Sequence, residues 1–360
     1  MIKRREFGKT LSGVLVAGAA PAATVHKKNT LMHVGADYHS VAGGPRADIT
    51  GKTNLEYNLR HGVKHLTAQL RKVSKDGRWD LDELKTMKEN CDRAGFIFEA
   101  IRMDSEYIML PPGSERDRRL EAITGNIEKA SQVGVKIITH HWTLIPIRRN
   151  AEVKGRGGVT YAAFKLEDNW KDLPVGQAGK VSSDDYWERI TNFLHTVIPV
   201  CKQYDVKMAA HPYDPPGLPF GYQGAENWDS PSVFEGFKRY AAIVDSPYNG
   251  FQLCLGTTAE GLKNPADVLP VAKYLGERGR IHQVHMRNIR GGLYNFQEVY
   301  PDEGDIDFLK VMRILRDVQF SGSICPDHMP SHPDDPGKLQ AYAFGYGYIK
   351  ALMQVVNSEV

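Results

Sequence analysis

Short hydrophobic runs recur along the chain and alternate with stretches of a different periodicity. The runs are six or seven residues long, the length of a buried strand, and turn-forming or polar residues bound them. They occupy residues 31–36, 64–69, 96–101, 135–141, 206–211, 250–256, 280–286 and 322–327. Nearly continuous runs of this kind are typical of a parallel sheet with both faces covered. The pattern therefore predicts eight strands.

Between the runs, hydrophobic residues recur at every third or fourth position, as on one face of an amphipathic helix. Residues 79–95 show this pattern, and Gly95 follows as a C-terminal stop. The face is formed by Leu81, Leu84, Met87 and Cys91. Helices are also predicted over residues 53–61, 119–134, 182–204 and 305–318. Ser183, followed by two aspartates, indicates the start of one of them.

Strands that alternate with helices in this way predict a single (β/α)8 TIM barrel over residues 26–360. An open, doubly wound sheet is the structural alternative, but no glycine-rich dinucleotide fingerprint follows any predicted strand. A long polar excursion over residues 142–182 follows the fourth strand. Because excursions of this length are usually lids or binding insertions, we expect this one to serve the functional site.

The composition fits a globular domain and narrows the range of partners. The chain has 360 residues, of which 41% are hydrophobic and 25% are charged, and its formal net charge is +3. Since the charge is nearly balanced and the basic residues are scattered, a nucleic-acid-binding surface is not expected. No hydrophobic run approaches the roughly 20 residues that span a bilayer. A small molecule is therefore the expected partner, and the sequence leaves the oligomeric state, including a homo-oligomer, open.

The first 25 residues have the anatomy of an export signal. Lys3, Arg4 and Arg5 precede a mildly hydrophobic stretch that ends in small residues suited to cleavage. The pair Arg4-Arg5, followed by Phe7, resembles the twin-arginine export motif, a route for proteins that fold before translocation. The sequence thus predicts a twin-arginine-like signal over residues 1–25 and a periplasmic location, with the cytoplasm as the alternative.

Four successive predicted strands end in side chains that can bind a divalent metal ion. Because active sites of such barrels lie at the C-terminal ends of the strands, these side chains are expected at one rim. They offer imidazole nitrogen, thiolate sulfur and carboxylate oxygen, and they are His211, Cys254, His285 and Asp327. Each alone has an ordinary structural explanation, such as a hydrogen-bonded histidine or a helix-capping aspartate. Their joint occurrence at matching positions predicts a metal centre.

Residues close to these strand ends are assigned by strand alternation. His282 precedes His285 by three positions, so it lies on the opposite face and is expected to be structural. Arg287 follows His285 by two positions and shares its face. A guanidinium beside a metal suits a carboxylate substrate, with an ion pair to a loop acid as the alternative. His140 and His141 end the fourth strand, and we take His141 as a substrate contact.

These residues lie in segments that resemble the mannonate dehydratase family. Residues 196–219, TVIPVCKQYDVKMAAHPYDPPGLP, resemble the family's helix and strand that lead into His-Pro-Asp-Asp-Pro-Pro. Residues 249–261, NGFQLCLGTTAEG, are similar to its cysteine segment, and 279–289, GRIHQVHMRNI, to its His-x-Arg strand. Residues 298–315, EVYPDEGDIDFLKVMRIL, and 324–332, ICPDHMPSH, resemble its last two motifs. The resemblance is ordered and covers close to half of the chain.

The resemblance implies a xylose-isomerase-like barrel that binds Mn²⁺, or Fe²⁺ or another divalent transition metal, through the four ligands named above. It implies dehydration of D-mannonate to 2-keto-3-deoxy-D-gluconate, a hydro-lyase reaction of hexuronate catabolism. It also implies proton transfer by His328 and by a C-terminal tyrosine. Tyr342 is the expected counterpart, with Tyr346 and Tyr348 as alternatives because "AYAFGYGY" leaves the register open.

The chain departs from the family pattern next to the expected metal ligands. Tyr213 and Asp214 stand where the family has two aspartates, Leu255 replaces a threonine, and Met329 replaces a glycine. These changes lie beside the expected metal ligands and leave the ligands themselves unchanged. They therefore bear on which sugar acid the protein takes as its substrate. The alternative function is a sugar isomerase or epimerase on the same barrel, although such enzymes use more carboxylate ligands than the one found here. A non-catalytic exported sugar-binding protein is the third hypothesis, which the retained His328 argues against.

Overall fold

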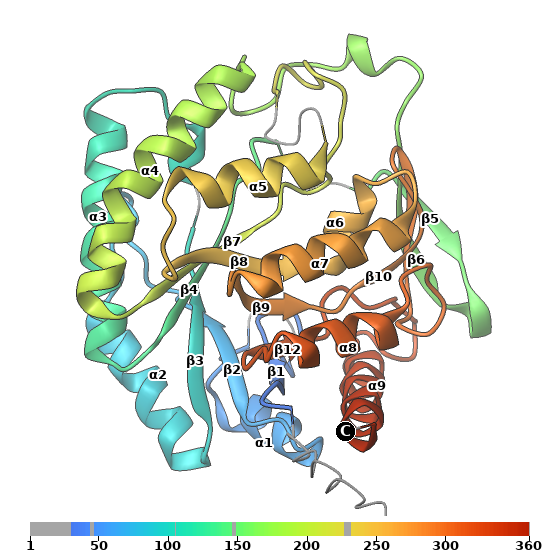
Figure 1. Ribbon diagram of the computed structural model, residues 1–360. Coiled ribbons are helices and arrows are strands. Elements are labelled where there is room, and N and C mark those ends of the chain that lie inside the picture. The colour runs from blue at the N-terminus through green and yellow to red at the C-terminus, as the bar shows by residue number, and fades with distance from the viewer. Residues whose placement is uncertain (1–29, 44–46, 105, 146–148, 227–231, 360) are drawn as a thin grey trace, which may run out of the picture.

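The computed structural model describes residues 30–43, 47–104, 106–145, 149–226 and 232–359, and its centre is a closed barrel of eight parallel strands (Figure 1). The strands are β1 (His33–Ala36), β2 (His65–Gln69), β3 (Ile97–Arg102), β4 (Ile137–His141), β7 (Lys207–His211), β8 (Asn249–Cys254), β9 (Ile281–His285) and β12 (Ser323–Cys325). The order around the barrel is β1-β12-β9-β8-β7-β4-β3-β2. Each strand coincides with one of the eight predicted runs, so the predicted TIM barrel is confirmed.

Helices surround the barrel (Figure 1). They are α1 (Lys52–Arg60), α2 (Leu81–Ala94), α3 (Ser114–Gln132), α4 (Ser183–Tyr204), α5 (Val233–Ile243), α6 (Leu255–Glu260), α7 (Val268–Glu277), α8 (Phe308–Asp317) and α9 (Leu339–Ser358). Four short 3₁₀ turns accompany them among the described residues: η1 (Glu106–Met109), η2 (Arg156–Gly158), η3 (Trp170–Asp172) and η4 (Pro265–Asp267). The five predicted helices are α1, α2, α3, α4 and α8.

Local chemistry explains where these helices begin and end. Asp80 caps α2 by accepting hydrogen bonds from the backbone N–H groups of Asp82 and Glu83, and Gly95 closes it with a φ of 72°. The cap of α4 is Ser182, one residue before the predicted start, and Asp185 completes a capping box with it.

A second, four-stranded sheet lies beside the barrel. It consists of β5 (Ala151–Lys154), β6 (Thr160–Lys165), β10 (Asn288–Gly292) and β11 (Asn295–Val299), in the order β10-β11-β6-β5. The predicted excursion over residues 142–182 therefore contains two strands, which sequence analysis did not predict. Both strands are short and β5 is mostly exposed, and β6 pairs with β11, which lies far away in the chain. Neither hydrophobic periodicity nor residue spacing therefore marks them in the sequence.

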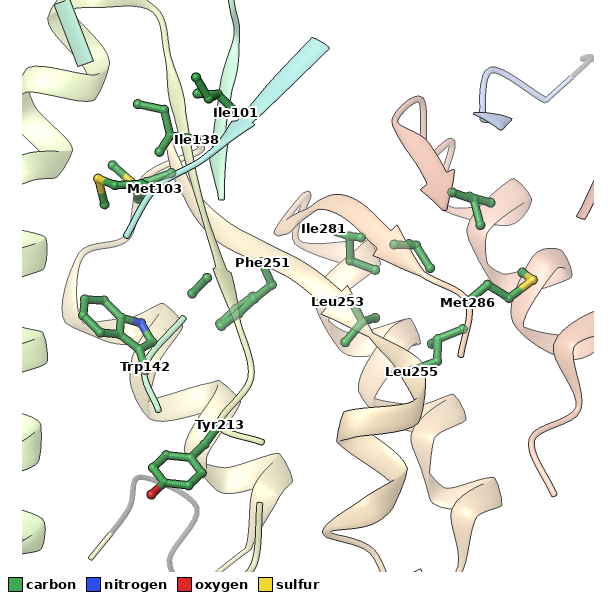
Figure 2. Packing of buried hydrophobic residues seen from close by; sticks show 14 of the residues in the cluster. Ile101, Met103, Ile138, Trp142, Tyr213, Phe251, Leu253, Leu255, Ile281 and Met286 are labelled. Atoms are coloured by element: carbon green, nitrogen blue, oxygen red, sulfur yellow. The ribbon is translucent and has the colours of Figure 1, made fainter. Parts of the chain in front are cut away.

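The two faces of the barrel strands differ in polarity. Ile138, Phe251 and Leu253 project from β4 and β8 among buried hydrophobic neighbours (Figure 2), and the Phe251 ring lies 5.0 Å from the Phe237 ring of α5. Inside the barrel the contacts are polar. The side-chain amide of Gln283 donates hydrogen bonds to Thr67 (2.6 Å) and Ser323 (3.0 Å). The barrel interior is thus held by hydrogen bonds, and the layer beneath the helices by hydrophobic packing.

Two predictions concern the surroundings of this domain. The predicted signal over residues 1–25 lies outside the described residues. Within the described part of the chain, no helix has both the length and the hydrophobicity needed to cross a bilayer.

Candidate metal centre and active site

The four predicted metal ligands come together at the C-terminal end of the barrel. His211, Cys254 and His285 are the last residues of β7, β8 and β9, and Asp327 lies two residues beyond β12. One ligand atom from each of the four lies within 4.8 Å of the other three, and all four residues are buried. Neighbouring parallel strands end at the same rim, which is why side chains 116 positions apart in sequence meet here.

Neighbouring groups fix the orientation of the two histidines. Nδ1 of His211 lies 2.8 Å from the carbonyl oxygen of Pro212, which accepts its proton and leaves Nε2 as the ligand atom. Nε2 of His285 lies 3.3 Å from Oδ2 of Asp37, and its Nδ1 lies 3.5 Å from Oδ1 of Asp327. The His211 imidazole is thus held from behind in the manner of a metal-binding histidine, and the His285 imidazole lies between two carboxylates.

The donor set fits a divalent transition metal. Among the described residues, neither ring nitrogen of His285 nor Oδ1 of Asp327 has a hydrogen-bond partner, although all three atoms are buried. Buried polar atoms normally find a partner, so unpartnered atoms on two of the four cluster residues support a cation there. Two imidazoles, a thiolate and a carboxylate favour borderline transition metals over Mg²⁺ or Ca²⁺.

The electrostatics of the cluster prepare the ligands for a cation. Burial lowers the pKa of His211 to about 4, so this imidazole is neutral and can ligate at physiological pH. Burial would raise the pKa of Asp327, but His328, His285 and Arg287 lower it well below its usual value and keep the carboxylate charged. Burial raises the pKa of the Cys254 thiol, so its thiolate form requires a nearby cation.

Arg287 lies in a network of acids directly beside the cluster. Its guanidinium is fully buried and lies 3.1 Å from Asp214, 3.1 Å from Glu260 and 2.9 Å from Glu298. The Nε atom lies 3.4 Å from Oδ2 of Asp327. A substrate carboxylate would reach this guanidinium only by displacing one of these acids. The geometry therefore favours a positioning role, and the predicted substrate contact stays a prediction.

A second arginine joins the same acids and was missed by sequence analysis. Arg149 lies 2.9 Å from Asp214, 3.2 Å from Glu260 and 2.7 Å from Glu298. Arg149 follows the fourth strand and Glu298 lies on β11, so the second sheet supplies part of the network. Since each acid contacts both guanidiniums, the network is a rigid support for whatever touches it.

His328 is half-exposed and connects this network to the site. Nδ1 lies 3.0 Å from Oε1 of Glu298, which also accepts a hydrogen bond from Arg287 (2.9 Å). Nε2 lies on the other side of the ring, 3.9 Å from Oδ1 of Asp327. Nδ1 also lies 2.9 Å from Nη1 of Arg287. In the tautomer with its proton on Nδ1, donated to Glu298, His328 presents Nε2 as an acceptor beside Asp327, a candidate metal ligand.

Of the three candidate tyrosines, Tyr342 is the one whose pKa is raised by burial and further by Asp327, a candidate metal ligand. Burial, with Asp37 and Asp327 adding to it, raises the pKa of Tyr342 well above its usual value. The Tyr346 hydroxyl instead lies 2.8 Å from Ser40 and 3.0 Å from Asn58, in a structural hydrogen-bond network. The Tyr348 ring packs at the outside against Phe308 and Phe344. The geometry therefore separates the three, which the repeated tyrosines of the sequence do not.

Two more histidines frame the cluster. The His141 ring stacks on the ring of His211, with centroids 4.2 Å apart, so this predicted substrate contact lies against a metal ligand. His39 was not predicted, and its Nδ1 lies 3.2 Å from both Asp37 and Asp327. Asp37 and His39 directly follow β1, so the strand-end rule, had it been extended to the first strand, would have found them. His282 lies outside the cluster, as expected.

Comparisons with known proteins agree with this geometry. A family model described as D-mannonate dehydratase matches residues 165–359. A mannonate dehydratase from Thermotoga neapolitana is 28% identical over 341 residues, which cover 82% of this chain and 91% of the relative. One from Streptococcus suis is 26% identical over 336 residues, covering 81% of this chain and 87% of the relative.

Solved structures show the same fold. The crystal structure of mannonate dehydratase from Streptococcus suis serotype 2 superposes with a TM-score of 0.77 at 24% identity, over 90% of this chain and 93% of that one. A xylose isomerase domain protein from Planctomyces limnophilus superposes with a TM-score of 0.58 at 14% identity, over 90% and 98% of the two chains. The fold is thus a xylose-isomerase-like barrel. Because the family model covers more than half of the chain and includes all four candidate metal ligands, the chain belongs to the D-mannonate dehydratase family.

Proposed function

We propose that this protein is a metal-dependent hydro-lyase that converts D-mannonate to 2-keto-3-deoxy-D-gluconate. The observation that carries the proposal is the buried convergence of His211, Cys254, His285 and Asp327 within 4.8 Å. The reaction removes the proton from C2 and the hydroxyl from C3 as water, and the resulting enol becomes the 2-keto acid. Mn²⁺ is the proposed ion, with Fe²⁺ next, because the thiolate and imidazoles favour transition metals.

A bound divalent cation would polarise the substrate carboxylate and stabilise the charge that develops when C2 loses its proton. The base for this proton is His328. Its Nδ1 faces Glu298 at 3.0 Å, so the Glu298 carboxylate stabilises the imidazolium that forms. Because Glu298 is itself held by Arg149 and Arg287, the base is kept in one position.

Tyr342 is the proposed acid that protonates the departing C3 hydroxyl. Burial and the neighbouring Asp37 and Asp327 carboxylates raise the pKa of its phenol well above its usual value, so it holds its proton at neutral pH. A neutral phenol can donate to a leaving hydroxyl and cannot serve as the initial base. This difference supports the proposal of His328 as the base and Tyr342 as the acid, roles that the sequence leaves open.

The test is a screen of aldonic acids with protein loaded with Mn²⁺, in which the 2-keto-3-deoxy product is detected by chemical derivatisation and mass. With Mn²⁺ bound we expect turnover of D-mannonate. Without metal we expect no 2-keto-3-deoxy product. Metal binding without turnover of any aldonate would contradict the proposal. In that case aldose–ketose interconversion, tested on the same samples, would identify an isomerase or epimerase instead.

The location of the protein is also a proposal. Arg4 and Arg5 at the start of the chain suggest twin-arginine export to the periplasm. We expect the native protein in the periplasmic fraction, and an Arg4→Lys, Arg5→Lys variant in the cytoplasm. Equal distribution of the two proteins would contradict export by this route.

A further inference from the structure

A second group of metal-binding side chains lies at the opposite end of the barrel. His33 and His65 are the first residues of β1 and β2, whereas His211, Cys254 and His285 are the last residues of their strands. Glu99 lies on β3, the next strand around the barrel. One ligand atom from each of His33, His65 and Glu99 lies within 4.8 Å of the other two.

The three side chains converge on one point. Nε2 of His33 and Nδ1 of His65 each lie 2.8 Å from the same carboxylate oxygen, Oε2 of Glu99. The two imidazole rings stack with their centroids 3.6 Å apart. Zinc binds histidine nitrogen and carboxylate oxygen at about 2.0 to 2.2 Å, so one ion can contact all three atoms after small side-chain movements.

An irregularity of the barrel aims Glu99 at the histidines. Leu66 pairs with Phe98 and Thr67 pairs with Ala100, so Glu99 is an extra residue between two regular pairs. A bulge of this kind turns the side chain of the extra residue away from its normal alternation. His65 shares a strand face with Thr67, which accepts a hydrogen bond from Gln283 within the barrel. The cluster therefore closes the barrel interior at its N-terminal end.

The cluster is accessible to an ion from solvent. The side chains of His33, His65 and Glu99 are 26%, 21% and 13% exposed. A cavity of about 330 Å³ reaches Glu99, and another of about 410 Å³ reaches the two histidines. Lys207 lines the first cavity and Lys64 the second, and their charge opposes cations that are held by charge alone. Imidazole ligands therefore favour Zn²⁺-like ions over Mg²⁺ or Ca²⁺.

We propose that His33, His65 and Glu99 form a second metal site, which takes Zn²⁺ or a similar borderline ion and joins β1, β2 and β3. Two imidazoles and one carboxylate leave a fourth position for water. On binding, the ion replaces the protons that the two site-facing nitrogens share with Glu99. The site lies at the end of the barrel away from the proposed active site, so its role is to fasten the first three strands together.

The experiment counts bound Zn²⁺ by equilibrium dialysis and elemental analysis in the purified full chain and in Glu99→Gln and His65→Asn variants. We expect two ions per chain in the native protein, and the loss of one ion, or at least a tenfold weaker second site, in each variant. His61→Asn is the matched control, since His61 is a half-buried histidine between α1 and β2 and outside the cluster. It should retain both ions.

Cobalt substitution separates this site from the one that contains Cys254. Cobalt bound by a thiolate gives a near-ultraviolet charge-transfer band, whereas nitrogen and oxygen ligands give visible bands alone. A Cys254→Ala variant should therefore keep a cobalt spectrum without the thiolate band, and a double variant that also carries Glu99→Gln should lose this remaining spectrum. Circular dichroism of the metal-free variants checks that they fold. Equal zinc content in the native protein and both cluster variants would overturn the proposal. So would a native protein that binds one ion per chain, when the Cys254→Ala variant loses that ion.

Discussion

Cys254 is the residue that sets the character of the proposed metal centre. Its thiol is fully buried and lies 3.4 Å from Oδ2 of Asp327, and Thr257 lies 3.2 Å from the sulfur. Only the thiolate binds a metal, and burial raises the pKa of this thiol, so metal binding must release its proton. Metal affinity at this site is thus coupled to pH through a single sulfur.

We expect Cys254→Ala to lower the manganese content of the protein and to weaken binding at least tenfold, because the soft ligand is lost. Elemental analysis after dialysis measures the effect. Cys201→Ala is the matched control, since Cys201 is equally buried but lies in α4, outside the cluster. Equal manganese in both variants would remove Cys254 from the ligand set.

Tyr342 offers a test of the proposed division between acid and base. We expect Tyr342→Phe to lower kcat on D-mannonate about 100- to 10,000-fold, the usual contribution of a positioned acid. Metal content should stay unchanged, because the tyrosine is not a ligand. Tyr348→Phe, in the same helix but against Phe308 and Phe344, serves as the control and should keep its kcat. A kcat within twofold of the native value for Tyr342→Phe would assign the acid elsewhere.

At the scale of elements, the second sheet holds the proposed base, His328, in position through Glu298. Glu298 of β11 contacts His328, Arg149 and Arg287, which come from three other parts of the chain. Without this carboxylate the imidazole loses its orienting acceptor and both guanidiniums lose a counter-ion. The second sheet thus contributes a side chain to the network beside the proposed active site.

We expect Glu298→Gln to lower kcat/KM by about 10- to 150-fold, since one hydrogen bond between charged groups contributes about 1.5 to 3 kcal/mol. The loss should appear mainly in kcat, and the acidic side of the pH profile, where a general base takes up its proton, should shift to lower pH. Asp302→Asn is the control, because Asp302 pairs with Arg156 at the surface. Steady-state kinetics over a pH series provide the measurement. A pH profile of unchanged shape would show that Glu298 does not act through His328.

The strand positions and the convergence of four candidate metal ligands could be predicted because each barrel strand has a distinct hydrophobic pattern. A run such as residues 206–211 is hydrophobic along its whole length, and His211 stands at its end. Arg149 and Glu298 could not be found in this way, since their contact joins residues 149 positions apart in the chain. His39 was missed because the strand-end rule was not applied to the first strand. For Arg287 the sequence leaves a substrate carboxylate and an acid of the chain as alternative partners, whereas the structure buries its guanidinium among three acids.

At the scale of the whole molecule, buried neutral histidines link stability to pH. His282 is buried beside Gly250, and a Cβ at that glycine would lie 2.4 Å from its Nε2. Among the described residues, neither of its ring nitrogens has a hydrogen-bond partner. Burial, with Lys207 and Arg280 adding to it, lowers the pKa of His282 from 6.5 to about 3. The imidazole is therefore neutral in the folded protein over most of the acid range.

This shift has a defined sign. Above pH 6.5 the imidazole is neutral in both states, and the stability is at its full value. Between pH 6.5 and about 3 the unfolded chain binds a proton that the folded protein does not, so stability falls as the pH falls. One such group contributes a slope of about 1.4 kcal/mol per pH unit.

We expect the free energy of unfolding of His282→Gln to fall less steeply as the pH falls, because glutamine binds no proton in the unfolded chain. Urea unfolding at pH 7, 6 and 5 in the presence of a chelator measures the free energy of unfolding without metal, so the ligand histidines contribute equally to both proteins. The variant should lose stability at neutral pH from altered packing, and the gap to the native protein should then narrow by about 1.4 kcal/mol per pH unit toward pH 5. Parallel curves for the two proteins would mean that His282 is not held neutral by the fold, and the acid sensitivity would then belong to the histidines of the metal centre.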